Sequence, residues 1–439
     1  MATVRRHRCS QESQSMTQPA DQTPGVLTGI RVVEFAQNAA IPHCGRLLAG
    51  LGADVVKVEP PEGDAMRRLI SLGEMESRAY ALINPGKRSI AIDLGSPDSR
   101  TVVDALFEWA DVALVAFKLP DLERYGIDWD QARTVNPRLI HLTHTALGPD
   151  GPDAHFGGYD ALVQGRSGVG YVMNRSGKTA PQPTRPAIND FGSGFSAAFA
   201  VMAGLRHRDQ TGEGQRIDTS LLGTAMSLGT PLLGRFRGDD ELLDELDADI
   251  AIVQAAGLDF DAQRDLYESK VQAGAGVFQL YFRHYRTSDG LISIAGLTPG
   301  LIAKFHSVTG VDRPTETDTS AASFLAVVTQ AEAVFSERTT AEWLAALRDA
   351  GYPCGPYNMP HEALQDPHAI ENGYVIELEH PVFGAYTATG MPFQMEKATS
   401  QIRGPSPSFA VDTRQVLEEV GFDEQLIDGL IASGAVISR

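Results

Sequence analysis

The sequence predicts an α/β protein with a doubly wound large domain and a smaller α+β domain. The first observation is a βαβ unit, in which the β-branched runs Ile30–Phe35 and Asp54–Val58 flank a stretch of helical apolar spacing, Pro42–Leu51. A strand, a helix and a strand within about 30 residues indicate a parallel sheet. The second observation is that this alternation continues along the chain. The third is that it stops near residue 225.

The later elements of the large domain follow in the same alternating order. Strands are expected at Ser89–Asp93, Val112–Ala116, Leu139–Thr143 and Gln215–Thr219, and helices at Ser99–Ala110 and Phe191–Arg206. Because helices separate the strands, they are expected to cover both faces of one sheet. We therefore predict a disordered tail over residues 1–25 and the large domain over residues 26–225.

From residue 226 onwards the pattern is different. An acidic helical region, Asp239–Asp265, precedes a hairpin at Tyr285–Gly296, and strands are expected at Tyr374–Glu379 and Ala385–Thr389. This pattern predicts a linker and a small α+β domain over residues 226–395. Two amphipathic helices within residues 412–437 indicate that residues 396–439 return to the large domain.

Composition and charge exclude several classes of protein. The chain has 439 residues, with 37 Lys and Arg against 56 Asp and Glu, and a formal net charge of −19. Nucleic acid and anionic membrane are not expected as partners, because both require a basic surface. Cys9, Cys44 and Cys354 have no metal-binding spacing, so neither a metal site nor a disulfide framework is expected. No apolar run approaches the roughly 20 residues of a membrane span, and we expect a cytoplasmic protein.

The turn after the first strand, Gln37–Pro42, lacks the GxGxxG pattern of dinucleotide-binding proteins. A Walker loop, an HExxH motif and a GxSxG motif are also absent from the sequence. No permanently bound cofactor is expected.

Several short motifs occur in one order along the chain: LLAGLGADVVKVEPPEGD (Leu47–Asp64), NPGKRSIAIDL (Asn84–Leu94), LERYGID (Leu122–Asp128), TGEGQRIDTSLL (Thr211–Leu222) and GYPCGP (Gly351–Pro356). In this order they resemble the class III CoA-transferases, a family that includes formyl-CoA transferase, carnitine CoA-transferase and the α-methylacyl-CoA racemases. The resemblance covers about Leu27 to Ile437. It implies a Rossmann-like large domain and an interlocked homodimer that acts on an acyl-CoA thioester and a free carboxylic acid.

Asp190 is the central candidate for catalysis. It stands directly ahead of the predicted helix at Phe191, where an aspartate is commonly an N-cap. The resemblance implies instead that Asp190 is the catalytic carboxylate, with Tyr159 and Gly192 in the catalytic site and with Tyr159 and Asp160 beside the thioester. A buried tyrosine with a capping aspartate is the alternative for Tyr159 and Asp160. A helix N-terminus favours an anionic carboxylate and supplies donors for an oxyanion, so the two interpretations are compatible.

CoA transfer without hydrolysis conserves the energy of the thioester in a covalent intermediate. The resemblance implies that Asp190 attacks the donor thioester to form a mixed anhydride and CoA thiolate. The thiolate then attacks the aspartyl carbonyl, which leaves an aspartyl-CoA thioester and the free donor acid. The acceptor acid reverses these steps.

Coenzyme A requires cations for its phosphates and apolar surface for its adenine and pantetheine. By motif, Arg124, Phe117 and Ile92 fall where the family holds this ligand. Lys87 and Arg88 are either helpers or solvated surface charges. The glycines of Ala273–Gly276 resemble a mobile loop of some transferases, although an ordinary connection explains them equally well.

Two alternatives to a transferase are a racemase or isomerase of the same fold and a CoA-binding protein without catalysis. Tyr159 stands where the racemases carry a histidine, and Thr298 stands where they carry a glutamate. A tyrosine hydroxyl is a poor base at neutral pH. Because both racemase residues are replaced, the transferase is the favoured hypothesis.

Overall fold

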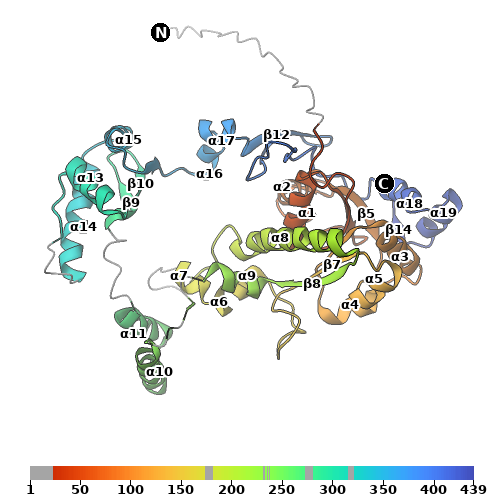
Figure 1. Ribbon diagram of the computed structural model, residues 1–439, viewed down its shortest axis with the longest axis horizontal. Helices are drawn as coiled ribbons and strands as arrows, with labels where there is room; N and C mark the ends of the chain where they lie inside the picture. The colour runs from red at the N-terminus through yellow and green to blue at the C-terminus, as the bar shows by residue number, and fades with distance from the viewer. Residues whose placement is uncertain are drawn as a thin grey trace, which may run out of the picture. The chain divides into compact units, whose positions relative to one another are not determined.

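The computed structural model describes residues 23–173, 181–230, 233–234, 236, 238–271, 280–314 and 321–439. The chain divides into two compact units (Figure 1). The larger unit contains the residues up to Leu233 together with Glu371–Arg439, and the smaller unit is Gly234–Ile370. The smaller unit is thus an insertion in the chain of the larger one. The domain limits at residues 225 and 395 stay predictions.

A seven-stranded sheet forms the centre of the larger unit, in the order β14-β5-β2-β1-β6-β7-β8. The strands are β1 Arg31–Phe35, β2 Asp54–Glu59, β5 Arg88–Ile92, β6 Val112–Val115, β7 Ile140–Thr145, β8 Gln215–Ser220 and β14 Val436–Ile437. Strands β5, β2, β1, β6, β7 and β8 pair in parallel, while β14 pairs antiparallel with β5. This sheet confirms the predicted α/β class.

Helices cover both faces of the sheet, and alternate residues of each strand point to opposite faces. On one face, Val32 of β1 packs in a core with the helices α1 (Ala40–Gly50) and α8 (Ile188–Thr211). On the other face, Val33 packs with α3 (Ser99–Trp109), α18 (Thr413–Glu419) and α19 (Glu424–Ala432). Figure 1 shows α1 and α8 together on their side of the sheet.

Strand order reverses between β1 and β6, because the chain runs from β1 outward to β2 and β5, and later from β6 outward to β7 and β8. In open α/β sheets, ligands bind in the crevice outside the carboxyl ends of the strands at such a reversal. The loops that begin at Ala36, after β1, and at Ala116, after β6, flank this crevice.

Helix α8 approaches α1 closely because Gly194 has no side chain. A Cβ at Gly194 would lie 2.7 Å from His43 Cδ2 and 2.9 Å from the carbonyl oxygen of Ala40. The His43 ring also makes edge contacts with Phe191 and Phe195, at centroid distances of 5.1 and 5.0 Å. This packing places the first turn of α8 beside the loop that follows β1.

Shorter elements complete the larger unit: the 3₁₀ turn Ala65–Arg68, β3 Ser71–Gly73, β4 Glu76–Ser77, α2 Arg78–Ile83, α4 Leu119–Tyr125, α5 Trp129–Val135, α6 Asp160–Arg166, α7 Val169–Met173, α9 Leu221–Leu228, β12 Val375–His380 and β13 Gly384–Thr389. The first described residues are held in place, because the Thr399 hydroxyl donates to the Thr23 carbonyl at 2.8 Å and Gly25 forms a bridge with Thr399. The predicted tail otherwise lies outside the described residues.

The smaller unit has a separate core around Trp343, Phe305 and Phe335. Its elements are α10 Asp240–Ala255, α11 Phe260–Val271, β9 Phe282–Arg286, β10 Leu291–Ala295, α13 Pro299–Thr309, α14 Ala321–Ser336, α15 Thr340–Asp349, β11 Cys354–Pro356 and α16 Pro360–Ala363, and α17 (Pro367–Glu371) crosses the boundary between the units. Strands β9 and β10 pair antiparallel, which confirms the predicted hairpin.

Candidate functional site

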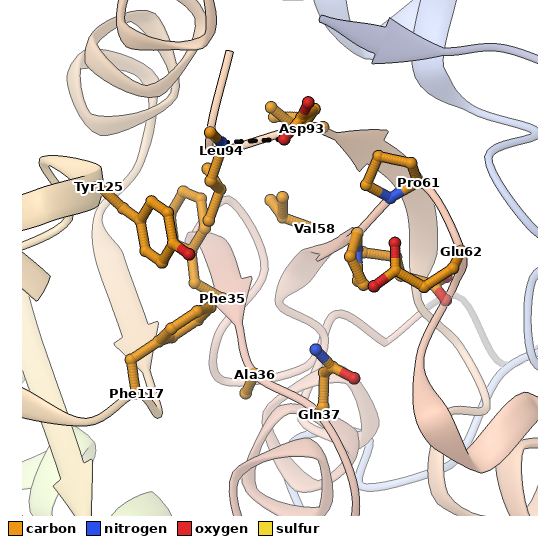
Figure 2. Close-up of a pocket in the computed structure, with 14 residues that line it drawn as sticks. Phe35, Ala36, Gln37, Val58, Pro61, Glu62, Asp93, Leu94, Phe117 and Tyr125 are labelled. Atoms are coloured by element: carbon orange, nitrogen blue, oxygen red, sulfur yellow. Dashed lines mark hydrogen bonds between the residues drawn. The ribbon is translucent and has the colours of Figure 1, made fainter. Parts of the chain in front are cut away.

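Two cavities lie at the carboxyl edge of the sheet. The larger, of about 650 Å³, is lined by the loop after β1, the ends of β6 and β7, the segment before α6, and Asp190. The smaller, of about 260 Å³, has the aromatic rings of Phe35, Phe117 and Tyr125 on one side and Pro61 and Glu62 on the other (Figure 2). Gln37 and Phe117 line both cavities, so the two are neighbours.

Asp190 is the third residue of α8, because the helix begins at Ile188, earlier than its apolar pattern predicts. The interpretation of Asp190 as the N-cap is therefore wrong. Ala187 occupies that position and offers no side-chain acceptor. The Asp190 carboxylate lines the larger cavity and accepts no hydrogen bond from the residues that the structure describes.

Asp160 provides the missing cap from a different helix. It is buried in the first turn of α6, and its Oδ1 accepts the N–H of Asn189 at 2.8 Å and the N–H of Asp190 at 3.3 Å. Its other oxygen, Oδ2, accepts a hydrogen bond from Gln164 Nε2. The placement of Asp160 beside a thioester stays a prediction, whereas its hydrogen bonds are made to α8 and Gln164.

The environment of Asp190 favours the neutral acid over the carboxylate. Burial raises the pKa of Asp190 from 3.8 to about 6, and the negative charge of Asp160 contributes to the rise. At neutral pH the group is therefore mostly ionised, yet its negative charge is poorly solvated. Such a carboxylate is more basic than an aspartate in water, and its nucleophilicity rises accordingly.

Tyr159 also belongs to the larger cavity, where its side chain is 74 % exposed. Gly192 lines neither cavity. It faces α9, since a Cβ there would lie 3.0 Å from Leu228 Cδ1 and 3.1 Å from Thr224 Cγ2. The structure thus brings Asp190 and Tyr159 together and gives Gly192 a contact with a neighbouring helix. The catalytic roles of Tyr159 and Gly192 stay predictions.

Of the residues expected to hold coenzyme A, Phe117 and Ile92 line the smaller cavity. Arg124 lines neither cavity; its side chain is 70 % exposed and lies 4.0 Å from Asp121. Its role in CoA binding stays a prediction. Ala273–Gly276 lies outside the described residues, and so does the loop predicted there.

Lys87 and Arg88 bind other protein groups. The Lys87 ammonium is buried and donates to Glu34 Oε2 at 2.8 Å. The Arg88 guanidinium donates to both carboxylate oxygens of Asp54, at 2.9 and 2.6 Å, and to Glu419 at 2.8 Å. Neither residue lines the two cavities. Their help in binding coenzyme A stays a prediction without support from these contacts.

Lys118 and His144 are polar residues of the larger cavity that the sequence motifs did not indicate. Among the described residues that line the two cavities, Lys118 is the only lysine or arginine. Gly157 leaves room for it, because a Cβ there would lie 2.8 Å from Lys118 Cε. The sequence did contain a signal for Lys118, because it is a cation that follows the buried strand β6 at the edge of the sheet where ligands bind.

His144 is a buried and uncharged member of the cavity wall. Its Nδ1 lies 3.0 Å from the hydroxyl of Thr219, and its Nε2 has no partner among the described residues. Burial lowers the pKa of His144 to about 4, so the imidazole is neutral at physiological pH. It offers a polar atom to the site without adding charge.

A buried ion network holds the loop after β1. The Lys57 ammonium lies 3.0 Å from Glu34 and 2.9 Å from Asp64, and it donates to the carbonyl of Ala36 at 2.6 Å. Asp64 in turn accepts the N–H of Asn38 at 3.3 Å. Asn38 has a φ of 66°, a left-handed conformation that this contact helps to maintain. These contacts within the protein therefore hold this loop, which forms one wall of the larger cavity, in place.

Within the part of the chain that the structure describes, no group of three or more His, Cys, Asp or Glu residues is arranged to hold a metal ion. In the same residues, no helix has both the length and the apolar character needed to cross a membrane.

Comparisons with known proteins identify the family. The profile of CoA-transferase family III matches residues 27–413. A succinate–glutarate CoA-transferase from Agrobacterium fabrum is 30 % identical over 414 residues, covering 90 % of this chain and 95 % of the relative. A succinyl-CoA:mesaconate CoA-transferase from Haloarcula marismortui is 28 % identical over 415 residues, covering 91 % and 97 %.

A solved structure, that of a CAIB/BAIF family protein from Brucella suis, is 27 % identical with a TM-score of 0.70, and the match covers 91 % of this chain and 100 % of that one. The family profile and these relatives span nearly all of the sequence. The chain therefore belongs to CoA-transferase family III and is a CoA-transferase.

Proposed function

We propose that this enzyme moves coenzyme A from an acyl-CoA to a free carboxylic acid through covalent intermediates on Asp190. The observation that supports this proposal is a half-buried carboxylate with a pKa of about 6, which accepts no hydrogen bond from the described residues and lines a cavity of about 650 Å³. A carboxylate placed in this way is available for attack on a bound thioester.

In the proposed reaction, an oxygen of Asp190 attacks the thioester carbonyl and the C–S bond breaks, giving a mixed anhydride and CoA thiolate. The thiolate attacks the aspartyl carbonyl, which forms an aspartyl-CoA thioester and releases the donor acid. The acceptor carboxylate then attacks this thioester, and the returning thiolate takes the acceptor acyl group and frees Asp190. Positioning of the reactants out of bulk water contributes about 7–11 kcal/mol in favourable intramolecular cases.

We infer that the adenine end of coenzyme A occupies the smaller cavity. Phe35, Phe117 and Tyr125 supply apolar and aromatic surface there, and Phe117 and Tyr125 form an edge-on pair with a centroid distance of 6.0 Å. Because Phe117 lines both cavities, a ligand that spans them would place its thioester near Asp190. Lys118 supplies a positive charge for the anionic parts of the ligand.

We infer that the exchanged acids are short dicarboxylic acids. The Agrobacterium and Haloarcula relatives are named for succinate, glutarate and mesaconate. The larger cavity is compatible with a second carboxylate, because Lys118, Asn38, Gln37 and His144 offer one cation and several neutral polar groups.

The decisive experiment combines trapping with substitution. Wild-type enzyme is incubated with succinyl-CoA and hydroxylamine, and peptide mass spectrometry is expected to find a hydroxamate on Asp190. Asp190→Asn and Asp190→Ala are expected to lose transfer to glutarate by several orders of magnitude, since the nucleophile is removed. A folded Asp190→Ala variant that keeps more than about a tenth of wild-type kcat would overturn the proposal.

We further infer a homodimer, with the interlocked arrangement that the family resemblance implies. On α8, Phe195 is 48 % exposed and Phe199 is 78 % exposed, and the two lie one turn apart. Met226 and Leu228 of α9 are also exposed, at 46 and 48 %. Large apolar side chains gathered on adjacent helices are typical of a surface that another chain covers.

A further inference from the structure

The start of α8 would ordinarily stabilise the negative charge of a nearby carboxylate. The first N–H groups of a helix have no partner within the helix, and the helix dipole is positive at this end. In this protein the N–H groups of Asn189 and Asp190 both donate to Asp160 Oδ1, at 2.8 and 3.3 Å. The donors next to the proposed nucleophile are therefore already used by a second carboxylate.

We propose that Asp160 is a positioning residue that fixes the first turn of α8 and, through its charge, keeps the Asp190 carboxylate strongly nucleophilic. This inference rests on the proposed role of Asp190. It reassigns Asp160 from a contact with the ligand to a contact with the helix that carries the nucleophile.

The position of Asp160 is itself fixed by a chain of hydrogen bonds. Gln164, one turn later on α6, donates from Nε2 to Asp160 Oδ2. Its Oε1 accepts the N–H of Thr184 at 2.9 Å, which fixes the amide orientation. Asp160 is 6 % exposed and Gln164 is 2 % exposed. Asp160 and Gln164 are thus hydrogen-bonded and closed to solvent, so the charge of Asp160 acts on Asp190 with little screening by water.

The other groups around Asp190 do not replace the charge of Asp160. Tyr159 on α6, His144 on β7 and Lys118 after β6 line the same cavity, and His43 on α1 contacts Phe191. Burial lowers the pKa values of His144 and His43 to about 4, so both rings are neutral near pH 7. Asp160 is the charged residue that raises the pKa of Asp190 beyond the effect of burial, and Lys118 is the cation of the cavity.

The chemical consequence concerns the first bond-making step. An Asp190 oxygen donates an electron pair to the thioester carbonyl while the sulfur leaves with the C–S bonding pair. A carboxylate stabilised by helix donors would be a weaker nucleophile, because the same donors would have to be given up in the transition state. With those donors bound to Asp160, Asp190 has fewer hydrogen bonds to lose.

The inference predicts a specific pH dependence. Asp190 attacks only when it is ionised, so kcat/KM of the wild type is expected to fall as the pH drops through about 6, the pKa of Asp190. Asp160→Asn removes the neighbouring charge and keeps an oxygen that accepts the two helix N–H groups. In the pH profile of kcat/KM, the acidic limb of Asp160→Asn is expected to lie about one pH unit below that of the wild type, and kcat is expected to be reduced above pH 7.

The matched control is Asp130→Asn, which removes one negative charge from an exposed position on α5, where the Asp130 side chain is 80 % exposed. Its acidic limb is expected to coincide with that of the wild type. If Asp160→Asn lowers kcat equally at every pH and leaves the limb unmoved, Asp160 acts only as a structural cap and the inference is wrong.

The double variant Asp160→Asn/Gln164→Glu serves as a rescue. It reverses the hydrogen bond between the two side chains and restores one negative charge at position 164, one helical turn from position 160. Its acidic limb is expected between those of the wild type and Asp160→Asn. A limb that stays at the Asp160→Asn position would contradict a role for the charge.

A measurement on the wild type keeps the inference testable if the variants do not fold. The carboxyl carbons of ¹³C-labelled aspartate are titrated by NMR, and the resonance missing from Asp190→Asn identifies Asp190. A midpoint near 6 is expected, and a midpoint near 4 would overturn the inference. Because hydroxamate formation on Asp190 is measured separately, failure of this inference is distinguishable from failure of the proposed function.

Discussion

The motif match and the cavity point to two different cations for coenzyme A, Arg124 and Lys118, which lie six positions apart in the chain. The motif match assigns Arg124 to coenzyme A, but its side chain is 70 % exposed and outside both cavities. Lys118 lines the larger cavity, and the absence of a side chain on Gly157 makes room for it. A resemblance carries over a residue type at a motif position, whereas a cavity depends on how loops from distant strands meet.

Substitution of these two cations separates the assignments. Lys118→Ala is expected to raise KM for the acyl-CoA by about ten- to a hundredfold with a smaller change in kcat, because a charge-assisted contact contributes about 1.5–3 kcal/mol. Arg124→Ala is expected to change KM less than threefold. Steady-state kinetics at constant ionic strength measure both. A larger KM effect from Arg124→Ala than from Lys118→Ala would favour the motif-based assignment.

At the scale of the elements, continuous β-branched and apolar runs separated by helical segments predicted the parallel strands and their order along the chain, because strands buried on both faces require such runs. The start of α8 was not predictable in this way. Its first turn, Ile188 to Asp190, is capped by Asp160 from α6, so the residue that marks the start of the helix lies far away in the sequence. Strand β14 was also missed, since its two residues are too few to show a period.

The close contact of α8 with α1 gives a prediction about stability. Gly194→Ala is expected to lower the free energy of unfolding by about 1–3 kcal/mol, because its Cβ would lie 2.9 Å from the Ala40 carbonyl oxygen, which belongs to the backbone and cannot rotate away. Urea denaturation followed by circular dichroism measures the change.

The control is Gly429→Ala, in the helix α19, where a Cβ meets no atom within 4 Å. There the added methyl group is expected to stabilise the protein by about 0.5–1 kcal/mol, the usual preference for alanine over glycine in a helix. Equal effects of the two substitutions would show that the contact between α1 and α8 is not tight.

At the scale of the whole molecule, the prediction concerns assembly. Interlocked chains cannot separate without unfolding, so the mass is expected to be that of a dimer at both micromolar and nanomolar concentrations. Light scattering and single-molecule mass measurements test this. Tagged and untagged protein are expected to exchange subunits only after denaturation and refolding. A monomer at nanomolar concentration, or rapid exchange without denaturant, would remove the interlocked arrangement.

The antiparallel edge strand β14 has a consequence for the synthesis of the protein. Val436 pairs with Ile92, so the outer edge of β5 lacks its native strand partner until residue 436 has been synthesised. An unpaired edge strand readily joins the edge of another chain and so promotes aggregation. The nascent protein therefore exposes this edge of the sheet from the synthesis of β5 until the synthesis of β14, and we expect its yield to depend on chaperones that cover such edges.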